Sequence, residues 1–291
     1  MKKNKLLISD VTLRDGNHAV SHSITSDIIK KYCLEAEKAK IKIIEVGHGN
    51  GLGASSLAIG RSTITDKLAL LTARKNLKKT KLSIHSIPGF SRIDDLKLAI
   101  DCGVDIFRIG ANATEIDTTS TQIKFCIKKK IEVWGVLMMA HLVYDKKKEY
   151  LAKIKYLIDQ GVSAVIIMDS AGIFLPNDIK EIFINIKNNF NINVGFHGHN
   201  NFGAAVWNSV VAVQNGANII DSSIKGFGAG AGNTQLDILI TVLERLGFST
   251  KIDLSKLYDL AKVFPNFFKN KKIAYRNPYS EPKNIMSANY G

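Results

Sequence analysis

The sequence contains few cysteines and no long apolar run, and each shortage argues against a class of protein. Its three cysteines, Cys33, Cys102 and Cys126, are far apart, which argues against a disulfide framework and a cysteine-based zinc site. The longest apolar runs, such as residues 162–168, are too short to span a bilayer. The first residues include lysines but no secretory apolar stretch, so we expect a cytoplasmic protein without a membrane partner.

The charge of the chain is strongly unbalanced. It has 40 Lys and Arg residues against 26 Asp and Glu residues, a formal net charge of +14, which raises the hypothesis of nucleic-acid binding. Most of the basic residues are lysines spread along the chain, and the densest clusters, 128–130, 146–148 and 269–272, lack interleaved aromatic residues for base stacking. We therefore favour solvated helix surfaces over a nucleic-acid partner, and keep attraction of anionic substrates as the weaker alternative.

Eight short apolar segments, rich in β-branched residues, alternate with segments whose apolar residues recur every three or four positions. The first predicted strand covers 5–10, and the others begin at Ile41, Leu82, Asp105, Ile131, Val162, Ile192 and Asn218. Predicted helices include 26–39, 94–100, 177–186 and 204–213, and Gly103, Gly161 and Gly216 fit the position just after a helix. Eight such units favour an α/β fold of the closed (β/α)8 TIM-barrel type over an open doubly wound sheet.

The periodic pattern stops near residue 250. We predict a barrel domain over 1–250 and a short C-terminal extension over 251–291, with one helix near 254–263 followed by a polar tail. A glycine-rich dinucleotide fingerprint does not open the first unit, which argues against a Rossmann domain.

Two histidines separated by one residue follow the predicted strand 192–196. Because alternate side chains on a strand point the same way, the imidazoles of His197 and His199 converge at its end. Asp15 follows the first strand, and in a barrel the reactive side chains gather at the carboxyl ends of the strands. We therefore predict a metal site of Asp15, His197 and His199, with a surface or structural histidine pair as the alternative.

One carboxylate and two imidazoles suit Mn²⁺, Co²⁺, Mg²⁺ or Fe²⁺, with coordination positions left for a substrate. Such an ion can chelate a 2-oxo acid and stabilise an enolate as a Lewis acid. Arg14 is placed to support the developing oxyanion, and His18 to accept a hydroxyl proton. The alternatives are a local salt bridge between Arg14 and Asp15 and a solvated loop histidine.

A run of glycine and alanine at 228–233 follows the last predicted strand. It either grips a phosphate or lets the backbone pass close to the metal site, and we favour the second interpretation. Asn233 either forms a hydrogen bond near the metal or caps the last helix of the barrel, and we favour the cap.

Taken together, these segments resemble the 4-hydroxy-2-oxovalerate aldolases. These are class II pyruvate aldolases in the superfamily of hydroxymethylglutaryl-CoA lyase and isopropylmalate synthase, whose shared unit is a pyruvate carboxyltransferase-like barrel. The matching segments occur in family order within 5–247: 8–18, 45–56, 137–139, 168–172, 197–201 and 228–233.

The resemblance implies a divalent metal, most often Mn²⁺ with Co²⁺ or Mg²⁺ as alternatives, held by Asp15, His197 and His199. It implies Arg14 as the residue that stabilises the enolate and His18 as the base on the 4-hydroxyl. Substrate-binding residues would be Arg14, Ser170 and His197.

The implied reaction is the cleavage of a 4-hydroxy-2-oxo acid, such as 4-hydroxy-2-oxopentanoate, to pyruvate and an aldehyde such as acetaldehyde, through a metal-stabilised enolate. The alternative is an acyl-CoA condensing enzyme or lyase of the isopropylmalate synthase or hydroxymethylglutaryl-CoA lyase kind. Those relatives usually have glutamine at the position of His18, which favours the aldolase. A barrel without catalytic activity is the third hypothesis.

Typical members of the family continue into a helical C-terminal domain that contacts an acylating aldehyde dehydrogenase. The resemblance makes 251–291 a remnant of that domain, which weakens the expectation of a dehydrogenase partner. It also makes Tyr290 the candidate for a catalytic tyrosine that the family has near this point.

Overall fold

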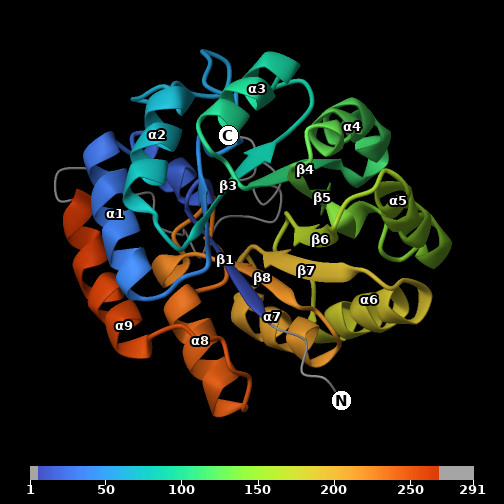
Figure 1. Ribbon diagram of the computed structural model, residues 1–291. Helices are drawn as coiled ribbons and strands as arrows, with labels where there is room; N and C mark the ends of the chain where they lie inside the picture. The colour runs from blue at the N-terminus through green and yellow to red at the C-terminus, as the bar shows by residue number, and fades with distance from the viewer. Residues whose placement is uncertain (1–5, 269–291) are drawn as a thin grey trace.

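The protein is a closed eight-stranded parallel barrel, seen along its axis in the computed structural model of Figure 1, which describes residues 6–268. Each strand pairs with the next one along the chain, and β1 pairs with β8. The strands are β1 (Leu7–Leu13), β2 (Ile43–Val46), β3 (Lys81–Ser86), β4 (Ile106–Asn112), β5 (Glu132–Met138), β6 (Ala164–Asp169), β7 (Asn193–Gly198) and β8 (Ile219–Ser222). The predicted TIM barrel is confirmed, and the open sheet was the wrong alternative.

Eight helices surround the barrel as its outer layer (Figure 1). They are α1 (Ser26–Lys38), α2 (Asp66–Asn76), α3 (Ile93–Asp101), α4 (Ser120–Lys128), α5 (Lys147–Asp159), α6 (Pro176–Asn189), α7 (Ala205–Gln214) and α8 (Leu236–Arg245). Short 3-10 helices lie in the loops: η1 (Asp15–Val20), η2 (Ala113–Thr119), η3 (Ala140–Leu142) and η4 (Ile224–Gly226). Gly103, Gly161 and Gly216 follow α3, α5 and α7 with φ of +80°, +92° and +106°, which confirms the predicted helix ends.

Strand β1 continues three residues beyond its predicted end, to Leu13. This part of the strand contains polar residues, so it lacks the apolar pattern that marks a buried strand in the sequence. In the structure, its polar side chains form hydrogen bonds inside the protein. Asp10 accepts hydrogen bonds from the hydroxyl of Tyr32 on α1 at 2.5 Å and from the backbone N–H of Thr12 at 2.9 Å. The loop that begins at Arg14 therefore starts directly at the carboxyl end of β1.

The barrel interior is built in two layers. An apolar layer is formed by Ile43, Ile106, Trp134, Val136, Ile166, Ile219 and their neighbours. Two residues farther along β2, β4 and β8 are Glu45, Arg108 and Asp221, all fully buried. Because alternate residues on a strand share a face, these charges lie directly above the apolar layer, toward the carboxyl ends of the strands.

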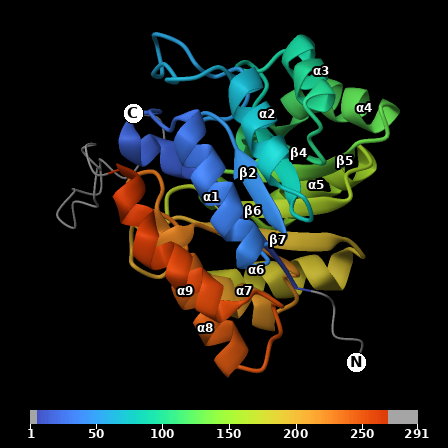
Figure 2. The same cartoon turned by 60° about the vertical axis from the view of Figure 1, so that its left-hand side comes forward.

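The described part of the C-terminal extension packs against the outside of the barrel. It consists of α9 (Leu254–Val263) and η5 (Phe264–Phe268), and α9 lies beside α1 and α8 in both views (Figure 2). Leu257 and Leu260 are fully buried, and Phe264 contacts Tyr32 and Phe227 edge to face. The predicted helix is thus confirmed, while the domain boundary at 250 stays a prediction.

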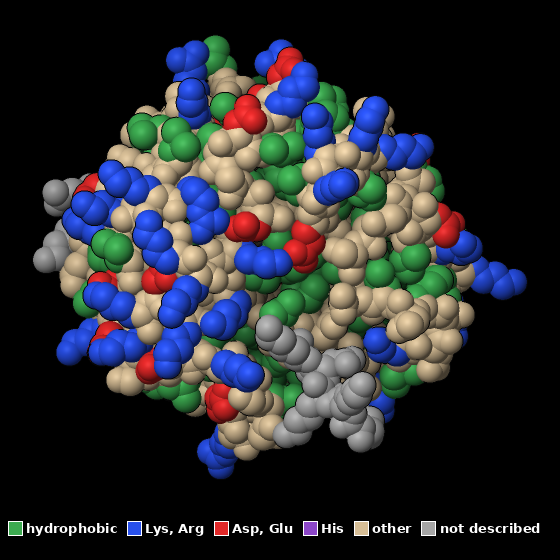
Figure 3. Space-filling model, in the orientation of Figure 1, with side chains coloured by type: hydrophobic (Ala, Val, Ile, Leu, Met, Phe, Trp, Pro, Cys, Tyr) green, Lys and Arg blue, Asp and Glu red, His purple; other side chains and the backbone are tan. Residues whose placement is uncertain are grey.

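Lysine and arginine side chains are scattered over the visible face in Figure 3, with acidic side chains between them. They are densest on the left, over α1 and α9, where Lys31 pairs with Asp27 and Lys256 with Asp259. This arrangement agrees with solvated helix surfaces, and the absence of a nucleic-acid partner stays a prediction. Between residues 6 and 268, the helices are too short or too polar to traverse a lipid bilayer.

The tight interior predicts a large effect for one glycine. A Cβ atom at Gly195 on β7 would lie 2.5 Å from Ile166 Cδ1 and 2.9 Å from both the Cβ and the carbonyl oxygen of Ile219. We expect Gly195→Ala to destabilise the protein by about 1–3 kcal/mol, measured by urea unfolding. Gly135→Ala on β5 is the control, because its Cβ would meet only side-chain atoms of Leu157 at 3.0–3.2 Å. Equal unfolding midpoints for both variants would contradict the expectation.

Candidate metal centre

Three predicted ligands, distant in the sequence, meet at the carboxyl end of the barrel. Asp15 is the first residue of η1, His197 lies in β7, and His199 follows that strand by one residue. The Nε2 atoms of His197 and His199 are 3.3 Å apart, and each is 3.9 Å from Oδ2 of Asp15. All three side chains are buried, and their ligand atoms lie within 4.8 Å of one another.

This geometry fits one divalent cation. Two atoms that are each about 2.1 Å from the same ion lie at most about 4.2 Å apart, and the three distances here are shorter. One oxygen and two nitrogens form a donor set that suits borderline cations, as the sequence predicted. The side chains therefore fit a metal, although they do not identify it.

Both imidazoles are prepared to act as ligands. Nδ1 of His197 lies 3.0 Å from Oδ2 of Asp221. Because that carboxylate can only accept a hydrogen bond, the proton of the imidazole is assigned to Nδ1. The lone pair of Nε2 then points toward Asp15 and His199, as a metal ligand requires. Burial lowers the pKa of His199 to about 4, against the attraction of Asp15, so this imidazole is neutral at physiological pH.

Asp15 is fixed by the loop that follows β8. Its Oδ1 accepts hydrogen bonds from the backbone N–H of Ala229 at 2.9 Å and from Nδ2 of Asn233 at 3.2 Å. The favoured interpretation of Asn233 as a helix cap is wrong, because the N-cap of α8 is Gln235. Asn233 instead holds a predicted metal ligand, a role that depends on the loop folding back across the barrel.

Small residues in this loop permit its close approach. A Cβ atom at Gly228 would lie 2.4 Å from Nδ2 of Asn233 and 2.8 Å from Oδ1 of Asp15. This contact supports the interpretation that the glycine-rich run lets the backbone pass next to the metal centre.

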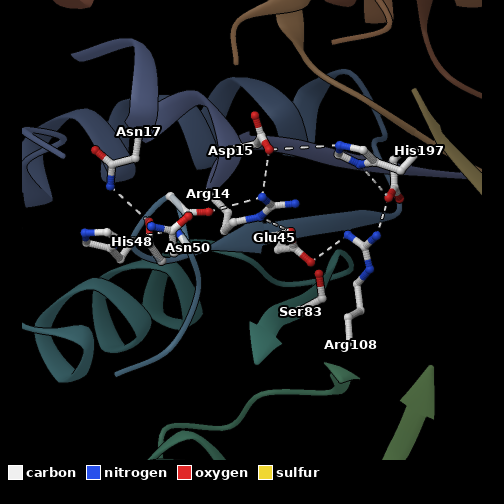
Figure 4. A network of polar contacts seen from close by, with 12 residues as sticks. Arg14, Asp15, Asn17, Glu45, His48, Asn50, Ser83, Arg108 and His197 are labelled. Carbon is white, nitrogen blue, oxygen red and sulfur yellow. Dashed lines mark hydrogen bonds and ion pairs between the residues drawn. The ribbon is translucent and has the colours of Figure 1, made fainter. Parts of the chain in front are cut away.

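A closed circuit of buried side chains includes two of the predicted ligands, and we call it the charge ring: Asp15, Arg14, Glu45, Arg108, Asp221 and His197. All of these except Asp221 are labelled in Figure 4. Arg14 pairs with Asp15 through Nη1 at 2.7 Å and with Glu45 through Nε at 2.5 Å. Arg108 pairs with Glu45 at 2.6 Å and with Asp221. The predicted Arg14–Asp15 salt bridge is thus one link of a larger circuit.

The ring keeps Glu45 and Asp15 ionised despite their burial. Burial by itself would raise the pKa of Glu45, but Arg108 and Arg14 outweigh it and hold that pKa at about 2. Burial by itself would also raise the pKa of Asp15, but the nearby Arg14 and His199 outweigh it and hold that pKa well below the usual range. A ligand carboxylate is therefore available to a cation over a wide range of pH.

A cavity opens beside the ring, with about 400 Å³ of empty space that includes open solvent at its mouth. Its lining includes Arg14, Asp15, His18, Ser170 and His199. Within residues 6–268, Nη2 of Arg14 has no hydrogen-bond partner, so a donor is left for a ligand. Ser170 accepts a hydrogen bond from the backbone N–H of Met139 at 2.9 Å, which leaves its own proton to donate. His18 is half-buried, and burial lowers its pKa, although Asp15 opposes this shift.

Sequence reasoning missed several polar residues of this site. His85 also lines the cavity, and Arg108 and Asp221 complete the charge ring. The two-residue spacing from Ile106 to Arg108 and from Ile219 to Asp221 was the available signal, because it places both charged groups on the interior face. Tyr290 lies outside the described residues, and its role stays a prediction.

Comparisons with known proteins are consistent with this geometry. A family model described as HMGL-like matches residues 5–264. The 4-hydroxy-2-oxovalerate aldolase of Pectobacterium atrosepticum is 48% identical over 260 residues, covering 89% of this chain and 75% of that protein. The protein of that name from Burkholderia pseudomallei is 41% identical over 286 residues, covering 98% and 80%.

Solved structures show the same fold. The carboxyl transferase domain of Rhizobium etli pyruvate carboxylase, determined with pyruvate and biocytin, superposes with a TM-score of 0.82 at 16% identity. The match covers 97% of this chain and 50% of that one. At this identity the likeness concerns the fold alone.

The hydrogen bond from His197 to Asp221 predicts a measurable effect on metal binding. Asp221→Asn removes the charge that orients His197, so we expect Mn²⁺ affinity to fall by about 10- to 100-fold, measured by isothermal titration calorimetry. Asp27→Asn is the matched control, since Asp27 is exposed on α1 and pairs with Lys31. Unchanged affinity in a folded Asp221→Asn variant would show that this contact does not tune the ligand.

Proposed function

This chain belongs to the HMGL-like family, and we propose that it is a divalent-metal-dependent aldolase acting on 4-hydroxy-2-oxo acids. The substrate is of the 4-hydroxy-2-oxopentanoate type, cleaved to pyruvate and an aldehyde of the acetaldehyde type, as the names of the relatives suggest. The observation that carries the proposal is the meeting of Asp15, His197 and His199 beside the unpaired Nη2 of Arg14. Mn²⁺ is the proposed metal, with Co²⁺ and Mg²⁺ as alternatives.

In this proposal Asp15, His197 and His199 hold the cation, which when bound supplies Lewis-acid polarisation of the 2-oxo group. Arg14 directs its Nη2 donor at the 2-oxo oxygen, where negative charge develops as the bond breaks. The contacts of Arg14 with Asp15 and Glu45 fix its guanidinium before the substrate arrives, so little reorganisation is needed. Ser170 donates its hydroxyl proton to the substrate carboxylate.

His18 acts as the general base on the 4-hydroxyl. Its neutral imidazole accepts the hydroxyl proton, the C3–C4 bond breaks, and the carbonyl of the aldehyde forms. The electron pair of that bond moves into the enolate of pyruvate, and the imidazolium returns the proton to C3, which becomes the methyl group. The lowered pKa of His18 favours the neutral form that this step requires.

An acyl-CoA condensing enzyme or lyase is the other reaction class within the family. Free thiol released from acetyl-CoA in the presence of a 2-oxo acid would identify it, and a folded protein that binds Mn²⁺ without any turnover would identify a non-catalytic barrel. A cytoplasmic location stays a prediction.

Pyruvate release tests the proposed function directly. We expect the protein to release pyruvate from 4-hydroxy-2-oxopentanoate in the presence of Mn²⁺, followed by coupling to lactate dehydrogenase. Chelation should abolish the activity and added Mn²⁺ should restore it, because the carbonyl then regains its Lewis acid. If no pyruvate appears with Mn²⁺, Co²⁺ or Mg²⁺, the proposal is wrong.

The pH profile tests His18. Because its pKa is lowered from 6.5, the base stays neutral as the pH falls through that value, and kcat/KM should decline only in more acidic solution. His18→Gln should lower kcat by about 10²- to 10⁴-fold and remove this acidic limb. His141→Gln is the matched control, since His141 lies on η3 and its side chain is not among those lining the cavity. An acidic limb that survives in His18→Gln would assign the base to another group.

A further inference from the structure

His85 is a buried polar residue of the cavity for which the proposed mechanism has no use. It lies near the end of β3, with only 2% of its surface exposed, and lines the same cavity as Arg14, His18 and Ser170. Its backbone carbonyl accepts a hydrogen bond from Leu52 at 2.8 Å, so the strand fixes its position. Within residues 6–268, its Nδ1 has no hydrogen-bond partner.

His85 takes no part in the ion pairs of the charge ring, although Arg14, Glu45 and Arg108 lie close enough to influence its pKa. It pairs in register with Arg108, yet Arg108 is already engaged by Glu45 and Asp221, and the charge ring closes without His85. Apolar side chains, Ile87, Met138 and Met168, also line the cavity. An aliphatic residue would suit such a wall, and a buried imidazole nitrogen without a partner is costly unless a ligand satisfies it.

The imidazole of His85 is neutral. Burial lowers its pKa to about 3, and the nearby Arg14 acts in the same direction. A neutral imidazole offers one N–H donor and one acceptor, which matches a hydroxyl group, since a hydroxyl also donates and accepts. A carboxylate is a poorer match, because it can only accept and would add a negative charge that a neutral ring does not compensate.

The position of that hydroxyl group on the substrate follows from the substrate groups to which the proposed mechanism already assigns a protein residue. Asp15, His197, His199, Arg14 and Ser170 serve the carboxylate and the 2-oxo group, and His18 serves the 4-hydroxyl. The portion left for the rest of the cavity is the one that leaves as the aldehyde.

We propose that His85 is a specificity-determining residue that forms a hydrogen bond with a hydroxyl group on the aldehyde portion, so that the preferred substrate is a 4,5-dihydroxy-2-oxo acid. The product released with pyruvate is then a hydroxyaldehyde such as glycolaldehyde. This inference rests on the proposed aldolase function and narrows its substrate class.

The test compares two substrates that differ in one hydroxyl, 4,5-dihydroxy-2-oxopentanoate and 4-hydroxy-2-oxopentanoate, by Mn²⁺-dependent pyruvate release. The wild-type protein should have the higher kcat/KM for the dihydroxy acid. His85→Leu removes both ring nitrogens, and we expect it to lower the ratio of the two kcat/KM values by about 10- to 100-fold, the effect of one buried hydrogen bond. His85→Gln keeps a donor and an acceptor and should retain part of the preference.

Ile84→Val is the matched control, because Ile84 is a buried apolar residue of the same strand that is not among the residues lining the cavity, and it should leave the ratio within about twofold of wild type. Exchange of the pyruvate methyl protons with deuterium, followed by NMR, reports whether each variant retains a working centre without any aldehyde present. If His85→Leu does not fold, the wild-type ratio and His85→Gln decide the question.

The outcomes separate the two levels of the proposal. Failure of the wild-type protein to release pyruvate from either substrate refutes the aldolase function itself. Release from both substrates with a preference for 4-hydroxy-2-oxopentanoate, or with a ratio unchanged in His85→Leu, overturns the inference about His85 while the aldolase function stands.

Discussion

The pairing of Arg14 and Arg108 with three buried carboxylates is the constraint on which the rest of the centre depends. Ions inside a protein are tolerated only when paired, and removing one partner of a buried pair costs about 3–5 kcal/mol. Here each guanidinium contacts two carboxylates, so the charge ring ties β2, β4 and β8 to the loop after β1. These contacts also fix Arg14 and, through Asp221, the orientation of His197.

The net charge of the charge ring bears on the proposed binding of a cation and an anionic substrate. Its three carboxylates and two guanidiniums leave one net negative charge when the histidines are neutral. A divalent cation at the candidate site would change this to one net positive charge, which the single negative charge of a 2-oxo acid would balance. Without a cation, the net negative charge of the ring would oppose such an anion.

The sequence predicted the strands and the metal ligands because both leave local patterns. Apolar segments of even spacing predicted the barrel, and two histidines separated by one residue at a strand end predicted the metal centre. The function of Asn233 depends on a loop that returns to Asp15 from more than two hundred residues away, which no local pattern records. The end of β1 was missed because the partner of Asp10 is Tyr32 on the following helix.

Arg108 and His85 were overlooked for a different reason. Each stands alone in a strand whose other residues are mostly apolar or small, so the segment resembles ordinary core. The two-residue spacing places Arg108 on the same face as Ile106, but the closed barrel is needed to show which face of a strand lies toward the axis and which toward the helices.

Asp15 comes from the first strand and His197 and His199 from the seventh, with β8 between them as the closing strand. A cation held by all three residues would link the two ends of the sheet where β8 pairs with β1. Its binding free energy would therefore be added to that of barrel closure.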